Sequence, residues 1–197
     1  MQLLIATTNP GKIREIRAIL LGAPVELVTL DSLDPIAEPE ETGQTFSENA
    51  RLKALYYNQA TGLPTVGEDS GLEIDALDGA PGVLSARWEG TNYQVKFRRI
   101  YELLRERGKT GSAARFVCAV AFANDGRIEY EVEGTVEGEI APEPRGSNGF
   151  GYDPVFLYPP LGRTLAEVTD EVKTSLSHRG SAFRALRRHL IDLPTFQ

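Results

Sequence analysis

Blocks of apolar and polar residues along the chain predict a mixture of strands and helices. The apolar run 2–7 is followed by a polar turn and an amphipathic segment over 10–21, which predicts a strand and a helix. A second strand is expected over 25–30. The segment 34–43 is rich in Pro and Glu, which is typical of a loop, and the capping-box pattern at 45–48 predicts a helix to about residue 60.

The middle of the chain predicts short strands and a further helix. Two short strands, 65–67 and 72–74, are expected on either side of a polar turn. Asn92 is a suitable N-cap for a helix that runs to about residue 107. By helical spacing, the residues of this helix that face the core are Val95, Ile100, Leu103 and Leu104.

The second half predicts a long central hairpin. The nearly continuous apolar run 115–123 predicts a central strand, because a strand buried on both faces is apolar throughout. Asn124-Asp125-Gly126 is a strong hairpin-turn signal before a return strand over 128–136. A long loop over 142–159 and a C-terminal helix follow. The expected fold is therefore α/β with a long hairpin, in one domain over 1–197.

Composition and charge narrow the class of protein. Hydrophobic residues make up 41% of the 197, as in ordinary globular chains, and the formal net charge is −7. This acidic balance argues against binding a nucleic-acid polymer through its phosphates. Cys118, the single cysteine, excludes an internal disulfide and lies in an apolar run without polar neighbours, so we expect it in the core.

The location of the protein is predicted from the same features of the sequence. No apolar run approaches the ~20 residues that span a membrane, and we see no signal-peptide pattern. A chain without disulfides fits a reducing compartment. We therefore expect a cytoplasmic protein with no membrane partner.

The first candidate site is the turn that follows the first strand. Asn9 suits a helix N-cap and Pro10 the first helical position, so unpaired amides are expected there, beside two hydroxyls and a lysine. Such a helix start favours a phosphate-like anion. The residues concerned are Thr7, Thr8, Asn9, Pro10, Gly11 and Lys12. The spacing is not that of a Walker A loop, and an ordinary capped helix is the alternative.

The second candidate site is acidic. Glu40 and Glu41 lie in a loop, whereas Glu68 and Asp69 directly follow a short strand, where ligands often bind in α/β folds. Magnesium prefers carboxylate oxygens and often uses one or two of them together with substrate phosphates. A carboxylate beside such an ion can also orient or deprotonate water. A solvated turn is the alternative.

Two further segments carry chemistry. The glycine-rich loop 147–154 holds Phe150 and Tyr152, which either stack on a planar base or anchor the loop to the core. Lys173, His178 and Arg179 supply hydrogen-bond donors at a predicted helix start. Capping of that helix with incidental charge is the alternative for the second segment.

Together these segments resemble one known family. Six motifs occur in the order found there: TTNPGK (7–12), EETGQTF (40–46), EDSGL (68–72), GAPG (79–82), FGYDP (150–154) and SHRG (177–180). The chain resembles the inosine triphosphate pyrophosphatases, or Ham1-like family, from residue 1 to about 190. Thr8 stands where many members carry glycine.

The resemblance implies a fold and an activity. The family hydrolyses the purine nucleotides ITP, dITP, XTP and dXTP to the monophosphate and pyrophosphate, with magnesium. Its fold is an elongated mixed sheet with two lobes, flanked by helices, around a nucleotide cleft. Members are usually homodimers.

The resemblance also implies residue roles. Residues 7–12 would contact the triphosphate and Ser70 the substrate, while Asp69 would be the proton acceptor and a metal ligand. Glu40 would help to bind magnesium, with Glu68 as a further candidate. The base pocket would be formed by Phe150, Gly151, Tyr152, Asp153, Lys173, His178 and Arg179.

The chemistry of the residues agrees with these roles and leaves two alternatives. Lys173, His178 and Arg179 present only donors, which suit the 6-carbonyl of hypoxanthine and xanthine and not the 6-amine of adenine. One alternative is a related pyrophosphatase for modified pyrimidine nucleotides, which would lack the Ser-His-Arg segment. The other is a nucleotide-binding regulator without turnover, which the clustered carboxylates disfavour.

Overall fold

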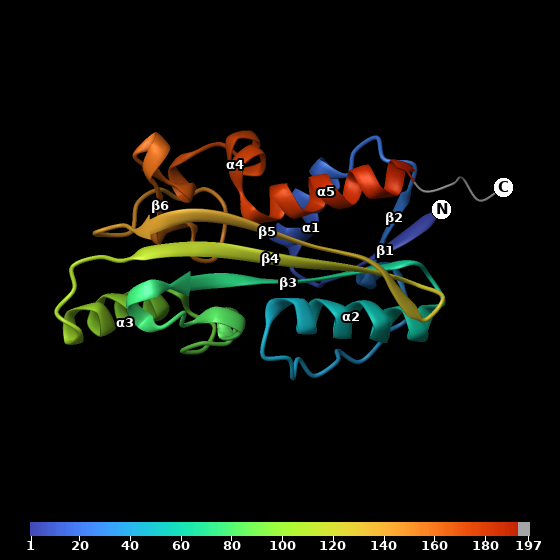
Figure 1. Ribbon diagram of the computed structural model, residues 1–197, viewed down its shortest axis with the longest axis horizontal. Helices are drawn as coiled ribbons and strands as arrows, with labels where there is room; N and C mark the ends of the chain where they lie inside the picture. The colour runs from blue at the N-terminus through green and yellow to red at the C-terminus, as the bar shows by residue number, and fades with distance from the viewer. Residues whose placement is uncertain (193–197) are drawn as a thin grey trace. The chain divides into compact units, whose positions relative to one another are not determined.

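The computed structural model describes residues 1–192 and contains a mixed seven-stranded sheet with helices (Figure 1). The strands are β1 (Gln2–Ala6), β2 (Glu26–Thr29), β3 (Thr65–Ile74), β4 (Ala113–Asn124), β5 (Arg127–Ile140), β6 (Phe156–Tyr158) and β7 (Arg163–Thr164). The α-helices are α1 (Pro10–Ile19), α2 (Phe46–Thr61), α3 (Tyr93–Glu106), α4 (Asp170–Leu176) and α5 (His178–Asp192). The order across the sheet is β2-β1-β3-β4-β5-β6-β7, which confirms the α/β class and the central hairpin β4–β5.

The chain divides into two compact units. Among the described residues, the first unit holds Met1–Asp69, Cys118–Gly134 and 178–192. The second unit holds Ser70–Val117 and Thr135–Ser177. Strands β3, β4 and β5 therefore each contribute residues to both units.

In the first unit, β1 pairs in parallel with β2 on one side and with β3 on the other. The chain passes from β1 through α1 to β2, and then through α2 back to β3, so the strand order reverses between β1 and β3. Ligands of open α/β sheets bind at such a switch point, beyond the carboxyl ends of the strands. Ala6 pairs with Gly67 at this place, so the segments that follow both residues begin side by side.

Packing around these strands fixes the first unit. Helices α1 and α5 lie side by side, as Figure 1 shows in blue and red. They share a core with β1, β3 and β4 that includes Leu3, Ile5, Ile16, Val66, Val120, Phe122, Phe183 and Leu186. Burial of large apolar side chains of this kind is worth about 1.5–3 kcal/mol each.

Gly67 lets α2 approach β3 closely. A Cβ atom at this position would lie 2.3 Å from the Ala50 carbonyl oxygen and 2.5 Å from the Ala54 amide nitrogen. Only glycine permits such an approach of two backbones. The close packing brings one face of α2 to the carboxylates that follow Gly67.

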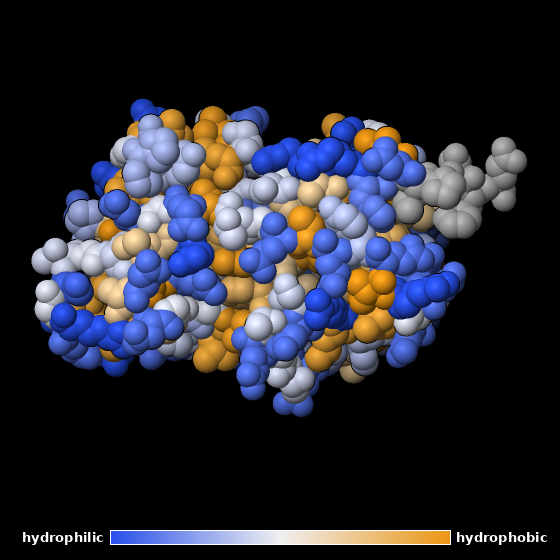
Figure 2. All heavy atoms as spheres, viewed as in Figure 1, coloured by the Kyte–Doolittle hydropathy of each residue, from blue (hydrophilic) through white to orange (hydrophobic). Residues whose placement is uncertain are grey.

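The second unit has its own core, which packs α3 against β3, β4 and β5. This core includes Leu72, Ile74, Phe97, Ile100, Leu104, Phe116, Val136 and Phe156. Strand β5 alternates between exposed and less exposed positions, as its sequence predicts. On the molecular face shown in Figure 2, hydrophilic residues predominate with smaller apolar areas between them.

The structure confirms most of the predicted elements and corrects three. The two short strands at 65–67 and 72–74 form one continuous strand, β3, so Glu68 and Asp69 do not lie in a turn. The loop predicted over 142–159 contains the short strand β6, which pairs with β5. Val95 is 40% exposed, and Lys96 beside it is buried instead. The assignment of 1–197 to a single domain stays a prediction.

No helix among residues 1–192 is long and apolar enough to cross a membrane.

Candidate functional site

The turn between β1 and α1 is closed by its own hydrogen bonds. The Asn9 carboxamide oxygen accepts from the amides of Gly11 and Lys12, at 2.9 and 3.1 Å, and Pro10 opens the helix. The Asn9 amide donates to the Thr7 hydroxyl at 3.2 Å. The expectation of unpaired amides at this helix start is therefore wrong, because the amides of Gly11 and Lys12 donate to the Asn9 cap. The cation of this turn is Lys12.

Lys12 belongs to a buried charge network at the switch point. Its ammonium lies 2.5 Å from Glu68 Oε1, while the second oxygen of Glu68 lies 3.5 Å from Arg179 Nη2. Arg179 also donates to Glu15 of α1 at 2.7 Å. Burial opposes the ionised form of Glu68, but Lys12 and Arg179 outweigh it and hold the pKa of Glu68 well below its usual range. Glu68 is therefore a permanent carboxylate at neutral pH.

Arg179 is bound into this network from the start of α5. The residue is 2% exposed, and burial opposes its charge, yet Glu68 and Glu15 raise the pKa of Arg179. His178, the first residue of α5, is also buried. The structure thus brings Lys12 of the predicted phosphate turn, Glu68 and Arg179 together within the first unit.

Cys118 lies in the core of the first unit, as its sequence predicts, but a polar side chain lies next to it. Its sulfur lies 3.4 Å from Glu68 Oε2. Burial, followed by the Glu68 charge, raises the pKa of the Cys118 thiol well above its usual value. A thiol held protonated in this way is no nucleophile.

Asp69 lies in a second polar cluster, on the side of β3 that meets α2. Its Oδ2 accepts from the Asn49 carboxamide at 3.0 Å, and its Oδ1 lies 3.6 Å from the Lys53 ammonium. Lys53 also donates to Glu41 at 2.8 Å. Burial raises the pKa of Asp69, an effect that Lys53 and Lys12 partly offset. Glu41, in the loop before α2, therefore shares a lysine with Asp69, whereas Glu40 is exposed.

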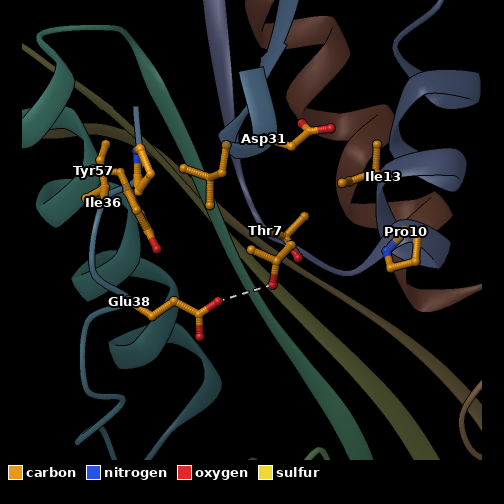
Figure 3. Close-up of a pocket in the computed structure, with 10 residues that line it drawn as sticks. Thr7, Pro10, Ile13, Asp31, Ile36, Glu38 and Tyr57 are labelled. Carbon is orange, nitrogen blue, oxygen red and sulfur yellow. Dashed lines mark hydrogen bonds between the residues drawn. The ribbon is translucent and has the colours of Figure 1, made fainter. Parts of the chain in front are cut away.

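A cavity of about 300 Å³ opens beside the turn between β1 and α1 (Figure 3). It is lined by Thr7, Thr8, Pro10, Ile13, Leu30, Asp31, Pro35, Ile36, Glu38 and Tyr57. The Thr8 hydroxyl donates to Glu38 at 3.2 Å, which directs it toward this cavity. Asp31 and Glu38 make the cavity unfavourable for a polyphosphate, because like charges repel.

In the second unit, Lys173 and the glycine-rich loop form a compact group. The Lys173 ammonium lies 2.5 Å from Asp153 Oδ2 and 4.3 Å from the centre of the Phe150 ring. The Phe150 amide donates to the same carboxylate oxygen at 2.7 Å. Gly149 has a φ of +71°, and a Cβ there would lie 2.1 Å from Asp153 Oδ2. This position therefore requires glycine.

Tyr152 anchors the same loop. It is buried, its hydroxyl donates to the Ser85 carbonyl at 2.9 Å, and its ring packs edge-on against Tyr93. Phe150 is only partly buried and covers the Lys173 ammonium. Of the two alternatives for these aromatics, the structure assigns anchoring to Tyr152. Ser70, the first residue of this unit, is partly buried.

Comparison with known proteins identifies the family. Residues 3–189 match the Ham1 family. The chain belongs to the Ham1 family. It is 44% identical over 191 residues to the dITP/XTP pyrophosphatase of Exiguobacterium sp., covering 97% of both chains. It is 49% identical over 187 residues to the enzyme of the same name from Nostoc sp., covering 93% of this chain and 91% of the relative.

A solved Ham1 structure agrees with the fold of this Ham1-family chain. The HAM1 protein from Coxiella burnetii superimposes with a TM-score of 0.90 at 36% sequence identity. The match covers 98% of this chain and 100% of the other.

The structure also reveals three polar residues that the sequence analysis did not select. Asn49 and Lys53 lie four residues apart on α2, and therefore on one face of the helix, and both reach Asp69. That spacing, beside the buried Ala50 and Ala54, is the signal that could have found them. Glu15 pairs with Arg179 from a position 164 residues away in sequence, and no local pattern marks it.

Proposed function

We propose that this Ham1-family protein hydrolyses dITP, ITP, XTP and dXTP to the nucleoside monophosphate and pyrophosphate. The observation that carries the proposal is the buried Asp69 at the switch point. Lys53 lies beside its carboxylate, and Lys12 lies in the adjoining network, where it pairs with Glu68. Identities of 44–49% to relatives named dITP/XTP pyrophosphatase support the choice of substrate.

Asp69 suits the role of general base. Burial raises its pKa, so its carboxylate holds a proton more readily than an exposed aspartate does. In the proposed reaction Asp69 takes a proton from water, and the water oxygen forms a bond to the α-phosphorus. The bond between that phosphorus and the bridging oxygen breaks, and pyrophosphate leaves with the bonding electrons.

The carboxylates near Lys53 fit a magnesium ion. Glu41 and Asp69 both turn an oxygen toward one ammonium group, so they already share a positive charge. Among residues 1–192 no group of three or more His, Cys, Asp and Glu side chains is placed to enclose a metal. Magnesium commonly binds one or two carboxylates and completes its shell with substrate phosphates and water.

We therefore assign Asp69 and Glu41 as candidate ligands, and Glu40 and Glu68 remain predictions. When bound, magnesium would neutralise phosphate charge. Glu68 already has Lys12 against one oxygen and Arg179 near the other. These contacts favour a role for Glu68 in holding Lys12 and Arg179.

Lys12 is the proposed contact for the triphosphate in the turn 7–12, because it combines a charge with partial exposure. For the base we keep the predicted set Phe150, Gly151, Tyr152, Asp153, Lys173, His178 and Arg179, with Ser70 as a further substrate contact. The donors of this set suit a purine 6-carbonyl. The buried Asp153 balances the Lys173 charge, so Lys173 would act as a hydrogen-bond donor more than as a net charge.

The biological setting belongs to the same proposal. We propose a homodimer in the cytoplasm that acts on free nucleotides, and not on a nucleic-acid polymer or at a membrane. The acidic net charge of −7 supports the exclusion of polymeric nucleic acid.

A product assay tests the proposed function. Purified protein is incubated with magnesium and, separately, dITP, XTP, GTP, ATP and a modified pyrimidine triphosphate, and the products are separated by anion exchange. We expect monophosphate and pyrophosphate from dITP and XTP, with much slower reaction of ATP. Release of inorganic phosphate and a diphosphate, or turnover only of the pyrimidine, would overturn the proposal. Binding without turnover would favour a regulator.

A further inference from the structure

Asn49 connects two parts of the candidate site through the two ends of one carboxamide. Its oxygen accepts from the Gly43 amide at 2.8 Å, and its nitrogen donates to Asp69 Oδ2 at 3.0 Å. The side chain is 0% exposed, so water does not substitute for either bond. Asn49 thus links the loop that carries Glu41 to the carboxylate of Asp69.

The chemistry of the two partners fixes the orientation of this carboxamide. At this contact Gly43 presents its N–H, which is a donor, and an ionised Asp69 presents only acceptors. Rotation of the amide by half a turn would place donor against donor and acceptor against acceptor. The arrangement therefore holds Asp69 in one orientation, with Oδ2 on Asn49 and Oδ1 on the side of Lys53.

Packing leaves little room for the arrangement to change. A Cβ atom on Gly43 would lie 2.6 Å from the Asn49 oxygen and 2.7 Å from Glu48 Cβ. Asn49 is also held through its backbone, whose amide donates to the Thr45 carbonyl at 3.2 Å. Loop, helix and carboxylate are thus joined through a single side chain.

We propose that Asn49 is a positioning residue, which orients Asp69 for proton transfer and keeps the Glu41 loop in register with it. This inference rests on the proposed function, in which Asp69 is the base. Loss of a hydrogen-bond partner behind a reacting or metal-binding group typically lowers activity about 10–100-fold. The expected defect is in kcat, since Asn49 itself would not touch the nucleotide.

The same helix offers a matched control in Asn58. Asn58 is 4% exposed, and its carboxamide also joins two segments, donating to the Leu63 carbonyl at 2.7 Å and accepting from the Gly126 amide at 2.8 Å. Neither partner is a candidate site residue. Variants of Asn58 therefore report the cost of losing a buried asparagine without disturbing Asp69.

Two substitutions at Asn49 separate its two bonds. Asn49→Asp is close in shape and keeps an acceptor for Gly43, but it loses the donor to Asp69. Asn49→Leu loses both bonds without adding charge. Should the leucine variant fail to fold, the aspartate variant carries the test, because it retains the link to the loop. Asn58→Asp and Asn58→Leu are made in parallel.

The readouts are kcat and KM for dITP, the dissociation constant for dITP in EDTA, and the thermal midpoint. We expect both Asn49 variants to lose about 10–100-fold in kcat while binding dITP in EDTA within about threefold of wild type. The Asn58 variants should lower the thermal midpoint with kcat within about threefold of wild type. This combination would separate positioning from stability.

The proposal is overturned if both Asn49 variants keep their kcat, or if loss of kcat follows the thermal midpoint equally at Asn49 and Asn58. It is also overturned if Asn49→Asp is fully active and only Asn49→Leu is impaired, because the Gly43 bond would then be the one that matters. A wild-type protein that releases no pyrophosphate from any purine triphosphate would instead remove the proposed function.

Discussion

The ammonium of Lys12 lies 2.5 Å from the carboxylate of Glu68. Lys12 lies in α1, which follows β1, and Glu68 lies in the neighbouring parallel strand β3, one residue after Gly67, whose partner Ala6 is the last paired residue of β1. The topology of the sheet therefore places a lysine from the start of α1 beside a carboxylate of β3, which is distant from it in sequence. A triphosphate that binds Lys12 must compete with Glu68 for this charge.

The Lys12 site predicts a binding defect. Lys12→Ala should raise the KM for dITP by about tenfold or more, because a hydrogen bond to a charged group contributes roughly 1.5–3 kcal/mol. Arg14→Ala, at an exposed position on the same helix, is the control and should leave KM within about twofold. Steady-state pyrophosphate release measures both. Equal KM values for Lys12→Ala and wild type would remove Lys12 from the phosphate site.

The role of Asp69 predicts a catalytic defect of a different kind. Asp69→Asn should lower kcat by about 10²–10⁴-fold, the usual contribution of a general base, and should keep affinity for dITP in EDTA. The asparagine matches the shape of Asp69 but accepts no proton. Asp75→Asn, which changes an exposed aspartate, should stay near wild-type kcat. Wild-type turnover by Asp69→Asn would contradict the assigned base.

Glu68 predicts how stability depends on pH. The pKa of Glu68 in the folded protein lies well below the ordinary value of 4.5. At a pH between these two pKa values, Glu68 therefore holds a proton in the unfolded chain and not in the folded chain. This contribution to stability is complete above about pH 4.5 and is lost as the pH falls toward the folded pKa. Glu68→Gln should therefore reduce the acid-side slope of the free energy of unfolding, by up to about 1.4 kcal/mol per pH unit.

Urea denaturation in EDTA between pH 7 and pH 3 measures this slope. Glu68→Gln is expected to be less stable than wild type at pH 7, since Lys12 and Arg179 lose their shared partner. The two curves should approach each other as the pH falls. Curves that stay parallel across this range would show that Glu68 does not titrate differently on folding.

Local sequence signals predicted much of this fold because they act through neighbouring residues. Asn9, Thr45 and Asn92 cap their helices as expected, since each cap bonds to amides within three residues of it. The pairs Lys12–Glu68 and Arg179–Glu15 were beyond such reasoning, because strand order creates them. The resemblance to a family selected Lys12, Glu68 and Arg179 without indicating that they are mutually paired.

Two of the predictions that were wrong, a turn at residues 68–71 and a buried Val95, have physical causes as well. Glu68 to Gly71 looks like a turn, yet the strand continues through it because Glu68 and Asp69 find buried partners. On α3 the apolar pattern placed Val95 in the core, but the interior takes the lysine beside it. A buried lysine requires acceptors that lie far away in sequence, and spacing on the helix does not reveal them.

The buried Lys96 therefore leads to a final prediction, which concerns the stability of the fold. Its ammonium donates to the Ser85 and Ala86 carbonyls at 2.8 and 2.7 Å and lies 4.5 Å from the centre of the Tyr93 ring, and burial lowers the pKa of Lys96. Lys96→Met nearly keeps the length of the side chain but leaves the Ala86 carbonyl without the ammonium donor. We expect a loss of about 1–3 kcal/mol in the free energy of unfolding, measured with urea at pH 7.

Lys109→Met, at an exposed site just after α3, is the control and should change stability by less than about 0.5 kcal/mol. An unchanged stability for Lys96→Met would mean that the two carbonyl bonds only offset the cost of burying the charge.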